Sequence, residues 1–530
     1  MPDLLSLESS QKVATPSNDG AARAGLRQWW PDLALLAALA AFLYVLVIQQ
    51  GYTRLFRDSD AGWHIRSGEA MLASWELPRQ DPYSFTRSGR PWMNWEWLAD
   101  AAAGALHRAG GLAAVAAWYS LAVAAAVWVW FRLHWKLGSN FLLAAALAAP
   151  LLGTLSLHWL ARPHLWGWVL MPLAVWWAEG ERTRSRLALY AALAALWANL
   201  HGSFVFAPLV ALVYAGAHLA RPLIWPLDRR AEWRAAGYYG WAAALAALAS
   251  LANPYGWRLH QHVVRYLADS ELLAGVNEFQ SFNFHLEGAW QIVLALGVAA
   301  AGGAAALAHR RLEHFLLIAL LLGWALRSAR GLPLAALVAL PIAAAHVSRS
   351  VRGAAVRSWL RRALHYGDRL GELDRQAAGW AVVPALAAAA LLAAAALLAA
   401  PGLGHRAGFP PESFPVTATA RLEQLAPELF QGAGRLLAPD KYGGYLIYRF
   451  EGRLKVFFDG RSDFYGREFL ADYRRLVQVR PGWERELERH GFTHALLPND
   501  YSLVEALERL GWQVLDRDAT ATLLRKHEVS

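Results

Sequence analysis

Long apolar runs, separated by short polar segments, fill the chain from residue 32 to residue 400. Runs of about 18 or more Ala, Leu, Val and Trp residues with few charges predict membrane-spanning helices. Only helices and closed barrels satisfy the backbone within lipid, and alternating ten-residue strands are absent from the sequence. The pattern therefore predicts a mainly α polytopic membrane protein with about eleven transmembrane helices. The expected spans are 32–50, 112–133, 141–160, 165–178, 186–200, 204–221, 237–252, 288–307, 314–327, 331–346 and 379–400.

Basic residues occur mainly in alternate loops between these runs, and the positive-inside rule places such loops in the cytoplasm. All of these loops fall on the side of the N-terminal tail. They are 179–186, 221–236, 308–313 and 347–378. We therefore expect a multi-pass protein of a bacterial-type inner (plasma) membrane with a cytoplasmic N-terminus. The extracytoplasmic side then receives 51–111, 158–164, 200–203, 253–287, 328–330 and everything after 401.

Residues 401–530 are mixed and charged rather than apolar. Strand-like runs at Lys455–Phe458 and Thr493–Leu497 alternate with helical patterns, which predicts a small α/β domain after a Pro- and Gly-rich linker, Pro401–Pro415. The helical patterns cover 466–478, 482–490 and 502–510. The predicted parts are a cytoplasmic tail (1–31), a transmembrane domain (32–400) with interfacial loop helices at 60–75 and 94–108, and a periplasmic, extracytoplasmic domain (401–530).

The amino-acid composition excludes several kinds of chemistry. Cysteine is absent from the 530 residues, which excludes disulfides, thiolate catalysis and Cys-ligated zinc. A net charge of +10 would suggest nucleic acid as the partner of a soluble protein. Here the basic residues lie in short loops between apolar runs, so topology explains the charge and we expect no nucleic-acid partner. The sequence also has neither a phosphate-binding Gly-rich loop before a lysine nor a Gly-x-Ser-x-Gly elbow.

The first long extracytoplasmic loop carries two neighbouring carboxylates just after the first span. Asp60 suits a helix N-cap, and His64, four residues on, would share its helix face. Several apolar residues fall roughly on one stripe, which is typical of an amphipathic helix on the membrane surface. These residues are Trp63, Ala70, Met71 and Trp75. One interpretation is that Asp58 and Asp60 only cap this helix, and the other is that they meet a lipid-linked substrate at the interface.

This loop resembles the first loop of the GT-C-fold glycosyltransferases, which include protein O-mannosyltransferases and lipid A aminoarabinose transferases. Their pattern is an acidic residue after the first span, then a Met-Leu pair and a Gly-x-x-x-Pro turn. Asp60 matches the acidic position and Met71-Leu72 the pair. Pro78 matches the turn, and His64 stands at a tyrosine-like position. The close match covers this loop, while the layout of many helices plus an extracytoplasmic domain covers the chain.

The resemblance implies a glycosyltransferase that moves a sugar from polyprenyl phosphate, with inversion, to a lipid, glycan or protein acceptor of the cell envelope. It implies that the first-loop carboxylate Asp60 is the general base, with Asp58 and His64 supporting it. A placed carboxylate assists deprotonation of an attacking hydroxyl by about 10²–10⁴-fold. The chain departs from the family at Ala61, where Glu is frequent. Whether Asp58 compensates, and whether a divalent metal ion is a cofactor, stays open.

Other extracytoplasmic segments supply candidate partners for such a donor. Arginine suits phosphate through its planar fork, and charged groups at membrane depth are often functional. The candidate residues for binding the donor phosphate are Arg162, Arg258, Arg327 and Arg330. The candidate substrate-binding residues are Trp63, His164, Asn199, His201, Asn253, Tyr255 and Glu278.

Each candidate also has a purely structural interpretation. An arginine at a span end can snorkel to lipid headgroups, and segment 253–256 has the pattern of a helix stop and turn. A lone histidine is usually a satisfied structural side chain. A metal site is a further alternative, which no close His-x-x-x-His spacing supports. Its ligands would be His64, His164, His201, Glu278 and Asp58.

Two dense polar segments stand out in the C-terminal region, Phe458–Gly466 and Lys441–Tyr445. They could bind the acceptor or form a lid over the membrane site. We favour the structural interpretation, in which they are strand-end turns with an internal Asp–Arg pair.

Two other classes of function stay open beside the enzyme. A flippase or permease for a lipid-linked or polar solute would often show internal repeats and helices broken near the midplane. The sequence shows no convincing repeat, and its polar groups gather at one face. A non-catalytic membrane assembly factor would instead use the C-terminal domain as a docking surface.

Overall fold

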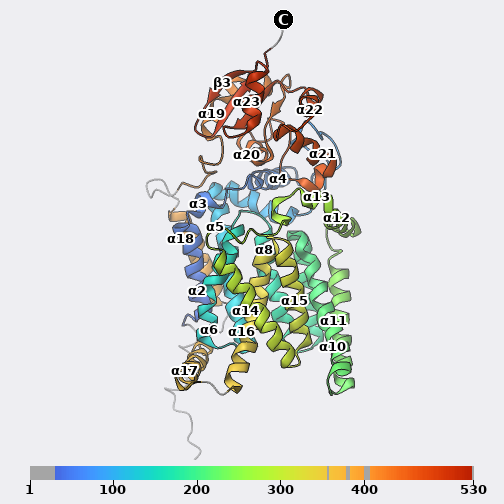
Figure 1. Cartoon of the computed structure of the whole chain (residues 1–530), viewed down its shortest axis with the longest axis vertical. Helices are drawn as coiled ribbons and strands as arrows, with labels where there is room; N and C mark the ends of the chain where they lie inside the picture. Colours follow the sequence, from blue (N-terminus) through green and yellow to red (C-terminus); the bar gives the residue numbers. More distant parts are fainter. Residues whose placement is uncertain (1–29, 355–356, 378–381, 399–405, 528–530) are drawn as a thin grey trace, which may run out of the picture.

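A bundle of long helices carries a smaller α/β body stacked on one of its ends in the computed structural model (Figure 1). The structure describes residues 30–354, 357–377, 382–398 and 406–527. Several expected segments therefore lie partly outside the described residues. They include most of the tail 1–31, residues 355–356 and 378 of the loop 347–378, both ends of the span 379–400, residues 401–405 of the linker, and residues 528–530 of the C-terminal domain.

The bundle and its connecting loops contain most of the described helices. They are α2 (Leu33–Leu43), a π-helical turn (Tyr44–Ile48), α3 (Gly51–Arg54), α4 (Asp60–Ser74), α5 (Trp97–Leu137), α6 (Phe141–Ala146), α7 (Ala148–Leu155), α8 (His164–Ala178), α9 (Arg184–Leu200), α10 (Phe206–Ile224), α11 (Arg229–Ala249), α12 (Trp257–Ala268), α13 (Ser270–Ala274), α14 (Ala289–Ala308), α15 (Leu312–Arg327), α16 (Gly331–Gly353), α17 (Ser358–Arg375) and α18 (Val382–Leu398). Short 3₁₀ turns lie at Ser156–His158, Gly202–Val205 and Asn277–Phe279.

Membrane-crossing helices are present, which confirms a mainly helical, multi-pass membrane protein. Within the described residues, 5 helices are long and apolar enough to cross a membrane. They are Trp97–Leu137, Phe141–His158, Gly202–Ile224, Ala289–Ala308 and Gly331–Gly353. The apolar helices Leu33–Ile48 and Val383–Leu398 are shorter. The other expected spans coincide with α8, α9, α11 and α15, so the number of about eleven spans stays a prediction.

The Arg-rich loops lie together at the end of the bundle that is opposite the α/β body. Arg311 is paired with Glu179 at 2.8 Å, which joins the loops before α9 and before α15. Arg221, at the end of α10, lies 3.7 Å from Glu313 of the same group. Helix α17, in the fourth basic segment, is at this end as well (Figure 1). The basic residues therefore gather on one side, and assigning that side to the cytoplasm stays a prediction.

Helix α4 is packed between two protein layers, α5 and α20, and whether its exposed end also meets lipid stays a prediction. Gly68 contacts the backbone of Asp100 on α5, and Gly62 contacts the backbone of Gly444 on α20. A methyl group at either glycine would overlap the neighbouring backbone, so both close approaches require glycine. The four residues of the expected apolar stripe are divided between buried and exposed positions. Trp63 and Met71 are buried, whereas Ala70 and Trp75 are exposed.

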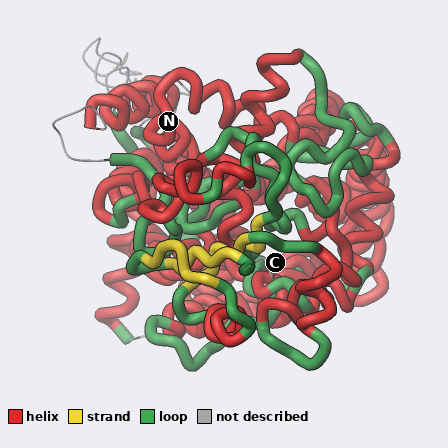
Figure 2. The backbone as a smooth tube through the Cα atoms, turned by 90° about the horizontal axis from the view of Figure 1, so that it is seen from above, coloured by secondary structure: helices red, strands yellow, loops and turns green. Residues whose placement is uncertain are grey.

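The α/β body has a sheet of order β1-β2-β4-β3 beside five helices and a 3₁₀ turn (Figure 2). Strands β1 and β2 are parallel, and the other two pairings are antiparallel. The strands are β1 (Leu436–Leu437), β2 (His494–Pro498), β3 (Gln513–Arg517) and β4 (Ala521–Arg525). The helices are α19 (Val416–Leu425), α20 (Asp440–Arg449), α21 (Ser462–Val477), α22 (Trp483–His490) and α23 (Ser502–Arg509), with the turn at Pro427–Leu429.

One expected strand, Lys455–Phe458, is not part of this sheet. Val456 instead forms an isolated bridge with Ser84 of the first extracytoplasmic loop. Its N–H donates to the Tyr83 carbonyl at 2.9 Å, and its carbonyl accepts from Phe85 N–H at 3.1 Å. The apolar run is therefore satisfied by a distant loop, which ties the C-terminal body to the membrane bundle.

Candidate functional site

A cavity of about 1350 Å³ lies where the α/β body meets the bundle. Its wall on the bundle side is apolar and comes from α8, α10, α15 and α16. That wall contains Trp168, Phe206, Leu209, Leu320, Leu321, Trp324, Pro333 and Leu334. The other side is polar and comes from the first loop, the 3₁₀ turn at Asn277–Phe279 and the C-terminal body. The cavity thus joins an apolar surface to a charged one.

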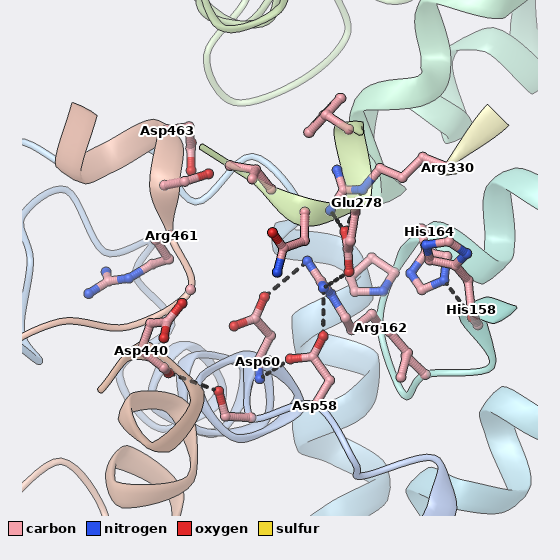
Figure 3. A pocket seen from close by; sticks show the side chains of 18 of the residues that line it. Asp58, Asp60, His158, Arg162, His164, Glu278, Arg330, Asp440, Arg461 and Asp463 are labelled. Atoms are coloured by element: carbon pink, nitrogen blue, oxygen red, sulfur yellow. Dashed lines mark hydrogen bonds and ion pairs between the residues drawn. The ribbon is translucent and has the colours of Figure 1, made fainter. Parts of the chain in front are cut away.

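Arg162 is at the centre of the charged side (Figure 3). Its guanidinium lies 2.8 Å from Asp58, 2.9 Å from Asp60 and 3.2 Å from Glu278. Arg330 donates from Nε to the other oxygen of Glu278 at 2.5 Å and stacks 4.6 Å above the Phe279 ring. We call these five charged residues the cavity cluster: Asp58, Asp60, Arg162, Glu278 and Arg330.

Local structure explains how these side chains come together. Asp58 accepts from the backbone N–H of Asp60 at 2.9 Å, so its carboxylate satisfies the first N–H group of α4; Ser59 occupies the N-cap position, and Asp60 is the first residue of that helix. This corrects the expected capping role of Asp60, whose carboxylate is left to face the cavity. The segment that carries Arg162 is tied to α3, because Ala161 N–H donates to the Leu55 carbonyl at 2.8 Å.

Glu278 is fixed by the turn that precedes α16. Arg330 N–H donates to the Glu278 carbonyl at 3.2 Å, and Ser328 Oγ donates to the same carbonyl at 3.1 Å. Burial alone would raise the pKa of Glu278, but the charges of Arg330 and Arg162 outweigh it and lower that pKa. Glu278 is therefore ionised and holds both arginines in place.

Asp60 behaves in the opposite way. Burial raises the pKa of Asp60 to about 7, against the effect of Arg162, and the charges of Asp58 and Glu278 add to the increase. Since one guanidinium serves three carboxylates, it does not fully offset the burial of Asp60. A carboxylate with a pKa near neutrality exchanges a proton readily at physiological pH, which suits a general base.

The C-terminal body forms part of the wall next to Asp60. A methyl group at Gly460 would overlap the Asp60 carboxylate, and one at Gly444 would overlap the Ser59 carbonyl. The neighbouring Arg461 is buried and donates to Asp459 at 2.8 Å from Nε and to Asp81 at 2.8 Å from Nη2. Segment 458–466 therefore contains the expected internal Asp–Arg pair, and it also lines the cavity.

Eight of the residues singled out from the sequence line this cavity. They are Asp58, Asp60, Trp63, Arg162, His164, His201, Glu278 and Arg330. The structure thus brings together residues from the first loop and from four later segments. Two of these residues also make local structural contacts. His164 Nε2 donates to the His158 carbonyl at 3.0 Å, and His201 Nδ1 accepts from Ser203 N–H at 3.1 Å.

The other six candidates do not line the cavity. His64 is buried and its Nδ1 lies 2.6 Å from Asp100 Oδ1, while Asn199 accepts from Trp97 Nε1 at 2.8 Å. Arg258 and Arg327 are exposed. Asn253 accepts from the backbone of Tyr255 at 2.8 Å, which is the turn geometry of the structural interpretation. Tyr255 itself donates to the Asn94 carbonyl at 3.2 Å.

Several cavity residues were not singled out from the sequence. Trp95 and Glu96, for example, stand in a Trp- and Asn-containing stretch of the first loop. The local signal was a cluster of aromatic and polar residues directly before α5. Such a cluster is also typical of a membrane interface, so the sequence alone does not distinguish the two.

The three carboxylates of the cavity cluster surround Arg162. Among the residues that the structure describes, no group of three or more His, Cys, Asp or Glu side chains has the arrangement of a metal site. The alternative metal site with His64, His164 and His201 therefore gains no support here. The use of a divalent metal ion stays a prediction.

Comparison with known proteins finds solved structures whose fold is similar to that of this chain. Neither a protein-family profile nor a curated protein sequence matches the chain. The solved structures that resemble it include the oligosaccharyltransferase AglB of Archaeoglobus fulgidus in complex with an inhibitory peptide and a dolichol-phosphate. That match has a TM-score of 0.54 at 10% identity and covers 88% of this chain and 69% of the other.

Two further structures of the same archaeal enzyme agree. The apo form has a TM-score of 0.55 at 10% identity and covers 88% of this chain and 69% of that one. The complex with Zn and sulfate has a TM-score of 0.52 at 12% identity and covers 88% and 68%. The chain therefore has the GT-C fold, and the resemblance inferred from the first loop is confirmed at the level of the fold.

Proposed function

We propose that this protein is a GT-C-type glycosyltransferase that takes its sugar from a polyprenyl-phosphate donor on the extracytoplasmic face of the membrane. The observation that carries the proposal is one cavity with an apolar wall and a charged wall. An isoprenoid phosphate sugar has an apolar tail, an anionic link and a polar head, and it needs both kinds of surface. The archaeal oligosaccharyltransferase of the same fold was solved with a dolichol-phosphate, which is a lipid of this class.

The apolar wall is suited to the lipid tail. Leu320 on α15 is 41% exposed and lines the cavity. Phe206 and Trp324 pack against each other along the same wall, with ring centroids 5.1 Å apart. A tail bound here would reach the cavity from the lipid side, so the donor need not leave the membrane.

Arg162 and Arg330 are the proposed partners of the donor phosphate. Both point into the cavity from the side of Glu278 (Figure 3). Planar guanidinium groups bind phosphate oxygens in a bidentate manner, and fixed cations stabilise negative charge as it develops on a leaving phosphate. Glu278 keeps these cations oriented before the donor arrives. The candidates Arg258 and Arg327 have no role in this proposal, because they lie on the exposed surface.

Asp60 is the proposed general base. When ionised, it would accept the proton of the attacking acceptor while the sugar transfers with inversion and the lipid phosphate leaves. Asp58 supports it by accepting from the first N–H group of α4 and by holding Arg162. His64, one turn further along α4, has a positioning role in this proposal, since it lies buried under Trp63 with ring centroids 3.6 Å apart.

The acceptor is proposed to enter from the side of the C-terminal body. Lys441 and Thr520 line that part of the cavity. The archaeal enzyme was solved with an inhibitory peptide, so a protein acceptor is one member of the proposed class, beside lipids and cell-envelope glycans. The end of the bundle with the Arg-rich loops would face the cytoplasm of a bacterial-type inner membrane.

The test of this proposal is the Asp60→Asn variant. Native membranes that contain the full-length protein would receive radiolabelled polyprenyl-phosphate hexoses, and the release of polyprenyl phosphate would be followed. We expect Asp60→Asn to lower this release by about 10²–10⁴-fold at unchanged protein level. The matched control is Asp500→Asn, the same substitution at an exposed carboxylate on the rim of the same cavity, which should keep wild-type turnover.

Two results would contradict the proposal in different ways. Wild-type turnover in Asp60→Asn would remove the base role and leave the donor class intact. A wild-type protein that moves the labelled lipid across the membrane without releasing polyprenyl phosphate would instead support the flippase alternative.

A further inference from the structure

Two neighbouring residues of the first loop, Trp95 and Glu96, line the cavity and have no part in the mechanism above. They lie directly before α5 and face His201 on the other side of the recess. Glu96 Oε1 is 3.4 Å from His201 Nε2, and the ring centroid of Trp95 is 6.3 Å from that of His201 at an interplanar angle of 26°. We call this part of the cavity the Trp95–Glu96 recess.

Glu96 is a buried carboxylate without a close partner. The residue is 8% exposed, and no described residue donates a hydrogen bond to its side chain. The nearest groups are His201 Nε2 and, at 3.8 Å, His64 Nε2. Burial raises the pKa of Glu96 to about 7, against the opposing effect of His64. A buried carboxylate that faces a cavity and has only these long contacts to neighbouring side chains is ready to accept a shorter hydrogen bond from a ligand.

Trp95 supplies a fixed aromatic surface beside this carboxylate. Its ring packs over Gly202, where a methyl group would overlap the indole. His262 lies on another side, with ring centroids 5.8 Å apart, and is itself held by Asp463 at 2.9 Å. The indole is therefore held between the His201–Gly202 segment and α12 and is half-buried, so one part of it stays open to the cavity.

An aromatic face next to a carboxylate matches the chemistry of a sugar ring. The C–H face of a pyranose packs on an indole, and its hydroxyl groups donate to a carboxylate. The carboxylate suits neither an isoprenoid chain, which has no donor, nor a phosphate, which a carboxylate repels. A polar, uncharged and cyclic ligand group is thus the class that satisfies both residues.

The recess also has the right position for the transferred group. His64 follows Asp60 by one helical turn on α4, and His64 is in turn the nearest α4 contact of Glu96. The charge of Arg162, which is paired with Asp60, acts on the pKa of Glu96 as well. A group bound in the recess is therefore adjacent to both the proposed base and the proposed phosphate partner.

We infer that the Trp95–Glu96 recess holds the glycosyl group of the donor, with the sugar ring on the Trp95 indole and a sugar hydroxyl donating to Glu96. This inference rests on the proposed function and adds the residues that select the sugar. It makes these two residues responsible for the difference in affinity between a lipid phosphate with a sugar and the same lipid phosphate without one.

The experiment measures this difference in affinity, between lipid phosphate with a sugar and lipid phosphate without one, in the wild type and in variants. Purified full-length protein would be titrated calorimetrically with farnesyl phosphate and with farnesyl-phosphate-linked glucose, galactose, mannose and N-acetylglucosamine. We expect at least one sugar lipid to bind the wild type about tenfold more tightly than farnesyl phosphate. Trp95→Leu and Glu96→Gln should each bring this ratio close to one and leave the Kd for farnesyl phosphate unchanged. Unchanged binding of farnesyl phosphate also shows that a variant is folded.

The chain offers a matched control in a second Trp-Glu dipeptide. Trp75-Glu76 lies at the exposed end of α4, and Trp75 is 87% exposed. Trp75→Leu and Glu76→Gln should keep the wild-type ratio. The inference is overturned if the recess variants also keep it, or if the wild type binds farnesyl phosphate but prefers none of the four sugar lipids. A wild type that binds no lipid at all contradicts the proposed function itself.

Discussion

The two ends of the helical bundle each contain a cluster of arginines and carboxylates, yet only one of them resembles a reaction site. The cavity cluster lies under the C-terminal body. The opposite cluster lies among the Arg-rich loops, and it consists of Glu179, Arg221, Glu232, Arg311, Glu313 and His314. In composition the two are alike, since both contain buried carboxylates within ion-pair distance of arginine.

The two clusters differ in whether they line the cavity and in their balance of charge. No residue of the opposite cluster lines the large cavity. Burial raises the pKa of Glu179, but His314 and Arg311 outweigh it and lower that pKa, so Glu179 is held as an anion. Asp60 instead shares its single arginine with two other carboxylates, and its pKa is raised to about 7. Buried charge is thus compatible with a structural or a chemical role, and the surplus of carboxylates beside an open volume separates the two.

The sharpest way to break this comparison is to remove the central arginine from each cluster. Arg162→Gln leaves three carboxylates without their shared cation, and we expect turnover per folded molecule to fall by about 10³-fold. Arg311→Gln should keep turnover close to wild type and lower the free energy of unfolding by about 2 kcal/mol, since Arg311 is partly exposed. The measurements are release of polyprenyl phosphate and thermal unfolding of the purified proteins.

Arg162→Lys guards against a variant that merely fails to fold. Lysine keeps the positive charge but loses the planar fork, so this variant should fold and still turn over slowly. Equal losses of turnover in Arg162→Gln and Arg311→Gln, each measured per folded molecule, would show that the two clusters do not differ in kind.

The same contrast explains how far the sequence could be interpreted. The hydropathy pattern predicted a helical membrane protein because the backbone within lipid has few alternatives. It also placed Asp58, Asp60, Arg162, Glu278 and Arg330 among the candidate polar residues of one membrane side, and the structure brings these five together in the cavity. The number of spans could not be fixed, because helices such as α9 and α11 begin with charged residues and are less apolar.

Which candidates face the cavity depended on distant contacts. Arg258 and Arg330 look equivalent in the sequence, but Arg330 is held by Glu278 whereas Arg258 lies on the exposed surface of α12. His64 was expected beside the base, yet its ring points to Asp100, 36 positions away. Gly460 was interpreted as part of a turn, and its contact with Asp60 spans four hundred residues of chain. No local pattern encodes such pairs.

The second prediction concerns Gly460, which brings the C-terminal body into contact with Asp60, the proposed base. A methyl group at this position would overlap the Asp60 carboxylate, which would have to move away from Arg162. We expect Gly460→Ala to reduce turnover by about 10²-fold, as a shift of about 1 Å in a reacting group does. Thermal unfolding should change little. Nothing lies within 4 Å of a methyl group at Gly408, so Gly408→Ala is the matched control and should be silent. Normal turnover in Gly460→Ala would separate the C-terminal body from the reaction.

The smallest expected effect concerns the pH dependence of turnover. If Asp60 is the base, turnover should rise with pH to a half-maximum near its pKa of about 7 and fall tenfold for each pH unit below it. Asp58 raises the pKa of Asp60 by charge repulsion, so Asp58→Asn should lower that pKa and move the half-maximum to lower pH by about one unit. The asparagine keeps an oxygen that can accept from the same N–H group of α4, so the helix start is preserved. The profile of Asp500→Asn should coincide with that of wild type, because Asp500 is exposed and solvent screens its charge. A half-maximum that stays fixed, or moves to higher pH, in Asp58→Asn would mean that the titrating group is not Asp60. The surplus of carboxylates around Arg162 would then not set the proton affinity of this site.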